Sequence, residues 1–246
     1  MDSMGLLKKL LKRLTRPRCN ICGGQKFTRG PGHRFGPTGT RPRCAGCHSL
    51  ERHRAFHRIF VALGPRRFRP LRCLQFSKDP TVDPRWFDRL EISIYGKQNS
   101  LDLQRIDRPD GSYDVIVCNH VLEHVADYRA ALRELARVLS PKGFLFLSFP
   151  DPLNIEHTMD WGYPDPADHA HYRHFGRDVE AVFRQELPEC HVVAVTTRDG
   201  VTGAADMAYV VTRSSDWFRR ARSLRLETRV CGGALPISRE PGRLRA

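Results

Sequence analysis

Four cysteines near the start of the chain form two pairs with the same internal spacing. Cys19 and Cys22 are the first pair, and Cys44 and Cys47 follow after 21 intervening residues. Two tight turns, each with two thiolates, close a tetrahedral Zn²⁺ site that has no open position. Residues 19–64 are therefore predicted to form a small zinc-ribbon-like module and a following helix. Because the loop between the pairs is rich in glycine, we expect the metal to be structural and to supply folding energy. A redox thiol cluster is the alternative.

A second group of reactive side chains follows a short apolar run at residues 113–119. Another apolar run covers residues 144–149, and an amphipathic helix is predicted between the two, over about residues 129–139. Two buried parallel strands joined by a crossover helix indicate a doubly wound α/β fold. Asn119, His120 and Glu123 then lie at the carboxyl edge of the sheet, where such folds bind ligands.

The run from His120 to His124 also fits the His-x-x-Glu-His pattern of a class of zinc proteases. That pattern needs two histidines one turn apart on a helix, whereas this run follows a strand directly. The context therefore disfavours a protease.

Histidines gather again after the second strand. The segment from 151 to 175 contains three prolines and no helical periodicity, which predicts a lid over the carboxyl edge of the sheet. Neutral imidazole has a pKa suited to removing a proton from a hydroxyl group. His169 is the first candidate for a general base and His171 the second, with His120 as a third position; structural hydrogen bonding is the alternative for each.

Three blocks of sequence, at 102–114, 121–125 and 137–143, resemble class I S-adenosylmethionine-dependent methyltransferases of type 11 in their order and spacing. The resemblance implies a Rossmann-like seven-stranded sheet over residues 65–213, with S-adenosylmethionine as cofactor. It also implies a set of cofactor-contacting residues. These are Gln75, Phe76, Ser77, Lys78, Asp102, Leu103, Asn119 and His120.

The chain departs from the methyltransferase pattern at two turns. The turn after the first predicted strand contains no glycine, although the family uses glycine there to let the backbone approach the cofactor. The turn at 96–99 carries Asn99 where the family places a carboxylate for the ribose. In the family, Asp102 accepts from the adenine amino group, with the Leu103 backbone alongside.

Two narrower resemblances concern the site. Some quinone-pathway O-methyltransferases hold a divalent cation at the positions of His120, Glu123 and His124, which implies a second metal near the acceptor. A cofactor-contacting turn and a helix cap are the alternative. The four cysteines, the run from Ser49 to Arg54 and the methyltransferase pattern together resemble a bacterial subfamily often encoded near surface-glycan genes. That comparison implies that Glu51, Arg52 and Arg54 reach the active-site mouth, and an Asp-His pair there matches Asp168 and His169.

The net charge of +14 is concentrated at the two ends of the chain. Residues 1–70 contain 17 Lys and Arg against 2 Asp and Glu, whereas residues 71–212 contain 15 against 22. Leucines and lysines at residues 5–16 predict a basic amphipathic helix, within residues 1–18, that lies on an anionic membrane surface. A helix packed on the protein is the alternative. Residues 214–246 are rich in Arg and predict a peripheral, partly disordered tail.

These features together predict methyl transfer to a hydroxyl or similar nucleophile on a small-molecule or glycan-like acceptor. One alternative is an RNA methyltransferase that docks through the four-cysteine module and the basic ends, although the acidic body and the missing Asn/Asp-Pro-Pro-aromatic segment disfavour it. Another is a non-catalytic scaffold derived from a methyltransferase. Eight cysteines without a secretory signal and no apolar run of membrane-spanning length suggest a cytoplasmic protein, peripheral at the inner face of the membrane.

Overall fold

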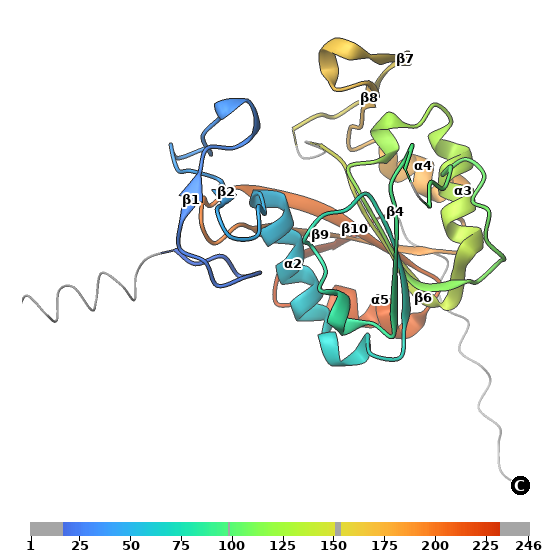
Figure 1. Ribbon diagram of the computed structural model, residues 1–246. Helices are drawn as coiled ribbons and strands as arrows, with labels where there is room; N and C mark the ends of the chain where they lie inside the picture. The colour runs from blue at the N-terminus through green and yellow to red at the C-terminus, as the bar shows by residue number, and fades with distance from the viewer. Residues whose placement is uncertain (1–16, 98, 151–153, 232–246) are drawn as a thin grey trace, which may run out of the picture.

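A seven-stranded mixed sheet forms the centre of the molecule (Figure 1). The computed structural model describes residues 17–97, 99–150 and 154–231. The strands run in the order β11-β9-β10-β6-β5-β3-β4, and the four from β6 to β4 are parallel. Their bounds are β3 Arg72–Phe76, β4 Arg89–Ser93, β5 Tyr113–Asn119, β6 Leu139–Ser148, β9 His191–Arg198, β10 Ala205–Thr212 and β11 Glu227–Val230.

Helices cover both faces of this sheet. Successive side chains of a strand point to opposite faces, and in the central strands both sets are apolar, so both faces must be covered. In β5, Val115 and Val117 face the layer of α2 (Glu51–Leu63) and α5 (Ser215–Arg222). Ile116 and Cys118 face the layer of α3 (Tyr128–Val138) and α4 (Val179–Glu186). The protein is therefore a three-layer α/β sandwich, and the predicted α/β fold is confirmed.

The unit β5-α3-β6 is the crossover that the sequence predicts. Asp127 begins α3 by accepting a hydrogen bond from the backbone N–H of Ala130 at 2.9 Å. At Gly143 a Cβ atom would lie 2.3 Å from the carbonyl oxygen of Asp114, so only glycine fits where β6 approaches β5. By contrast, the crossover from β3 to β4 contains only a single 3-10 turn, η3 (Pro84–Trp86).

The four-cysteine module (residues 19–64) lies at the carboxyl edge of the sheet. It contains the short strands β1 (Phe27–Thr28) and β2 (Arg43–Cys44), the turn η1 (Pro31–His33), and α2, which packs directly on the sheet. The module and the sheet domain thus share α2.

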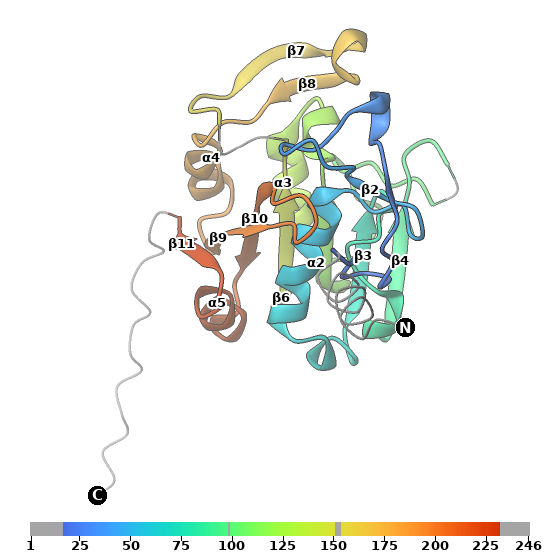
Figure 2. The same cartoon turned by 90° about the vertical axis from the view of Figure 1, so that its left-hand side faces the viewer.

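A β-hairpin follows β6 and stands beyond the sheet in both views (Figures 1 and 2). It consists of β7 (Met159–Asp165), the turn η5 (Pro166–Asp168) and β8 (His171–His174). The buried Arg173 anchors it, because its guanidinium donates to Asp160 at 2.7 Å and to the carbonyl of Ala126 at 2.7 Å. The hairpin is therefore fixed against the turn that follows β5.

The prediction of a tail from residue 214 is wrong for its first part. Residues of α5 pack on the sheet with Ala221 fully buried, and β11 pairs with β9 as the seventh strand. The predicted amphipathic helix at residues 5–16 lies outside the described residues. None of the helices in the described part of the chain is long and apolar enough to cross a membrane.

Candidate active site and metal centre

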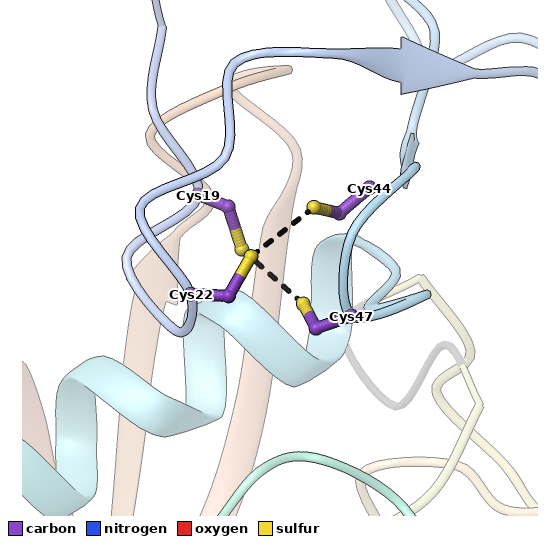
Figure 3. Close-up of side chains that lie close together, drawn as sticks. All are labelled: Cys19, Cys22, Cys44 and Cys47. Atoms are coloured by element: carbon purple, nitrogen blue, oxygen red, sulfur yellow. Dashed lines mark hydrogen bonds between the residues drawn. The ribbon is translucent and has the colours of Figure 1, made fainter.

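The four predicted cysteine ligands lie together at the base of the module (Figure 3). The Sγ atoms of Cys19 and Cys47 are 3.6 Å apart, and those of Cys22 and Cys44 are 3.5 Å apart. Tetrahedral Zn–S bonds of about 2.3 Å require S–S separations of about 3.8 Å. The residues present therefore fit a closed structural zinc site.

The local backbone explains how each pair forms its tight turn. The N–H of Gly23 donates to the carbonyl of Cys19 at 2.7 Å, and the N–H of His48 donates to that of Cys44 at 3.0 Å. Both donors have left-handed backbone conformations, with φ of 76° and 59°. The two turns thus have matching geometry, although only the first contains glycine at this position.

The glycine-free turn after β3 adopts the backbone conformation that a glycine would supply. Ser77 has φ of 62°, and its N–H donates to the carbonyl of Ser93 at 2.9 Å. Gln75 and Lys78 line a hollow of about 510 Å³ between this turn and α2, while Phe76 is buried on the opposite face. The predicted residues of this turn therefore border a hollow of the size that small ligands occupy.

The other predicted cofactor residues lie outside that hollow. Asp102 is exposed and its Oδ1 accepts from the N–H of Gln104 at 2.9 Å, whereas Leu103 is buried in the core. Asn119 is buried and its amide donates to Asp79 at 3.2 Å and to Thr81 at 3.3 Å. The turns lie at one edge of the sheet. Among the residues that the structure describes, however, no hollow is lined both by Asp102 and by the turn after β3.

His120 directly follows β5 and has a left-handed conformation, with φ of 51°. Its Nδ1 lies 3.8 Å from Oε1 of Glu123, and its buried Nε2 has no hydrogen-bond partner in the described chain. Burial, followed by the charges of Arg52 and His53, lowers the pKa of His120 well below its ordinary value. The ring is therefore neutral near pH 7 and retains one nitrogen lone pair.

Glu123 is fully buried beside this histidine, and neither carboxylate oxygen has a partner among the described residues. Burial raises the pKa of Glu123 to about 8, while Arg52 and Arg173 act in the opposite direction. Unpaired buried carboxyl groups are costly, so such a group indicates a role beyond packing.

The hairpin brings His171 to the same place. Ligand atoms of Glu123, His124 and His171 lie within 4.8 Å of one another, and the rings of His124 and His171 pack edge to face at 4.6 Å. His120 is not a member of this group. The predicted triad of His120, Glu123 and His124 is thus brought together only in part. Because the turn η4 (Leu122–His124) has three residues, the protease pattern finds no helix here.

The two histidines predicted as bases differ in their surroundings. His169 is exposed on the hairpin tip with φ of 57°. His171 is buried, with Nδ1 3.3 Å from Oδ2 of Asp168, which also accepts a hydrogen bond from His174. The approach of His171 to Glu123 and His124 is not predictable from the sequence, because this contact depends on how β8 folds back over η4.

The sequence matches one family model and part of a curated relative. The model of the family described as "Methyltransferase domain" matches residues 52–185. The ubiquinone biosynthesis O-methyltransferase of Xanthomonas oryzae is 53% identical over 38 residues, which are 15% of this chain and 16% of that enzyme. The match thus spans about a sixth of the curated relative.

Two solved structures are among those to which this chain is similar. One is the 1,6-didemethyltoxoflavin-N1-methyltransferase of Burkholderia thailandensis, which is 14% identical, with a TM-score of 0.42 over 65% of this chain and 78% of that chain. The other is a SAM-dependent methyltransferase of Thermotoga maritima, 12% identical, with a TM-score of 0.40 over 63% of this chain and 89% of that chain.

The family match begins one residue into α2 and ends within α4, so it includes β3 to β6, the whole parallel part of the sheet. Since these matched residues are more than half of the chain, the protein belongs to the methyltransferase domain family.

Proposed function

We propose that the protein transfers a methyl group from S-adenosylmethionine to a hydroxyl or similar nucleophile on a small-molecule or glycan-like acceptor. When bound, the cofactor supplies an electrophilic methyl group. The turn after β3 would hold the cofactor. Ser77 has the left-handed backbone conformation that a glycine would supply in this turn, and Gln75 and Lys78 border the adjacent hollow. The family match supports this proposal, and it gives the RNA-directed and scaffold alternatives no specific support.

The observation that carries the proposal is the orphaned ring nitrogen of His120. This residue lies directly after β5, at the edge where doubly wound sheets bind ligands, and it lines a hollow there. A neutral imidazole accepts the proton of the acceptor hydroxyl as its oxygen attacks the methyl group. The resulting charged ring is stabilised by the Glu123 carboxylate at 3.8 Å, when that group is ionised. His169 and His171 remain the alternative bases, on the hairpin above.

The test follows a labelled methyl group from S-adenosylmethionine into a panel of phenolic and sugar acceptors. At saturating cofactor, His120→Gln should transfer the label about 10² to 10⁴ times more slowly, the usual contribution of a general base. His157→Gln is the matched control, because this histidine is exposed and outside the hollow. Failure to transfer the label to any phenolic or sugar acceptor, or a wild-type rate for His120→Gln, would contradict the proposal.

A divalent cation near the acceptor is the second part of the proposal. Imidazole and carboxylate ligands suit zinc and other first-row metals, and Glu123, His124 and His171 offer that set. The zinc-loaded protein should then bind a second metal equivalent, and His171→Ala should lose that equivalent alone. Metal analysis that finds the same content in both proteins would remove this part.

A further inference from the structure

A second hollow, of about 720 Å³, lies between the four-cysteine module and the sheet domain. Phe35 and Arg52 line it from the module, and His120 and Met207 line it from the sheet domain. Its volume is in the range of pockets that enclose small molecules. Because His120 forms part of its wall, a molecule in this hollow would lie next to the proposed base.

One cation in this wall has no acidic partner among the residues that the structure describes. Arg34 forms a bidentate pair with Glu51, at 2.7 and 2.9 Å, so these two charges cancel. Arg52 makes no ion pair with any residue that the structure describes, although it is half-buried.

Asp206, at the start of β10, is the other acidic residue of the wall. Its Oδ1 accepts from the N–H of Met207 at 2.9 Å. A guanidinium at the rim of a hollow suits a carboxylate or phosphate, because its planar set of N–H groups matches either anion.

The two walls of the hollow are held in a fixed position by a buried ion pair. Arg54, two residues after Arg52, donates to both carboxylate oxygens of Asp199 at 2.8 and 2.7 Å. Asp199 begins the loop that leads to β10, and residues 204–207, at the end of this loop and the start of β10, line the hollow. Arg54 also donates to the carbonyl of Ser49, next to the cysteine cluster. The hollow is thus preorganised by contacts that do not need a ligand.

We infer that this hollow is the acceptor site and that the acceptor carries an anionic group, a carboxylate or a phosphate, held by Arg52. The four-cysteine module therefore forms half of the acceptor site. This inference rests on the proposed function, because it takes His120 as the group beside the reacting hydroxyl.

The test uses the zinc-loaded full chain and two probes of the same shape, benzoate and benzamide, which differ in charge. Nitrogen-15 spectra follow the side-chain signals of Arg52 and His120 during each titration. Benzoate should saturate both signals at least about tenfold more tightly than benzamide, the scale of a charge-assisted hydrogen bond. Inorganic phosphate should compete with benzoate.

Arg52→Gln should abolish the preference for benzoate, whereas Arg69→Gln, the same change of charge on an exposed residue before β3, should keep it. Equal affinities for the two probes in wild type, or a preserved preference in Arg52→Gln, would overturn the inference. Binding of S-adenosylhomocysteine is measured in the same samples. Its loss in wild type would contradict the proposed function, whereas its retention together with equal probe affinities contradicts only the anionic acceptor.

Discussion

His53 shows how one buried residue makes the stability of the protein depend on pH. Its Nδ1 accepts a hydrogen bond from the N–H of Leu50 at 3.1 Å, at the third position of α2, where Glu or Gln often does the same. Burial lowers the pKa of His53 to about 4, opposed by Asp79. In the unfolded chain, His53 therefore binds a proton below about pH 6.5, whereas in the folded chain it binds this proton only below about pH 4.

The neutral state of His53 should thus cost stability as the pH falls through this window, by at most about 1.4 kcal/mol per pH unit. His53→Gln keeps an acceptor for Leu50 and cannot titrate, so its free energy of unfolding should fall less steeply from pH 6.5 to 5. Urea unfolding at each pH, with zinc content checked, measures the two slopes. Parallel slopes for both proteins would show that His53 is not the cause.

At the scale of single residues, the sequence predicted types and spacing better than surroundings. Cys19, Cys22, Cys44 and Cys47 were found because two ligand pairs on tight turns need only local backbone geometry. The left-handed backbone conformation of Ser77 was not predicted, because serine has no preference for that conformation. The approach of His171 to Glu123 was also missed, because it depends on the packing of the hairpin.

The buried pair of Arg54 and Asp199 joins two elements that are far apart in the sequence. Asp199→Ala should lower the free energy of unfolding by about 3 to 5 kcal/mol, because it leaves a buried guanidinium without its counter-ion. The double variant Arg54→Met/Asp199→Leu should lose less free energy of unfolding than the sum of the losses in Arg54→Met alone and Asp199→Leu alone. Urea unfolding of the four proteins forms a double-mutant cycle, and strict additivity would argue against a coupled pair.

The four-cysteine module should depend on its metal for order. Purified protein should contain one tightly bound zinc in this site, and Cys44→Ser should lose it together with hydrogen-exchange protection of residues 19–47. Because Arg54 and α2 also pack on the sheet, protection of β5 should persist. Protein prepared without chelator that contains no zinc would contradict this prediction.

At the scale of elements, predictability follows how local the signal is. The bounds of β5 and α3 were predicted to within about one residue, because their apolar periodicity is strong. The strand β6 begins at Leu139, before the predicted run at 144–149, because the segment that was predicted as a turn pairs as part of the strand. The helix α5 and strand β11 were missed. Their arginines suggest a solvated tail, and only packing on β9 and β10 makes them part of the fold.

For the whole molecule, the fold predicts where the chain can be shortened. A chain that ends at Arg213 loses α5 and β11, exposes the apolar face that Trp217 and Phe218 cover, and should be destabilised by about 3 kcal/mol or more. A chain that ends at Cys231 keeps both elements and is the matched control. Thermal unfolding compares them, and equal midpoints would support the tail prediction instead.

Calorimetric titration of S-adenosylhomocysteine into the zinc-loaded full chain is the most direct test of the methyltransferase assignment. We expect saturable one-to-one binding at the carboxyl edge of the sheet. Asp102→Ala should weaken it by about 1 to 3 kcal/mol, the value of a charge-assisted hydrogen bond, whereas Asp107→Ala, an exposed carboxylate in the same loop, should not. Absence of binding by the wild-type protein at millimolar ligand would contradict the assignment of a methyltransferase activity.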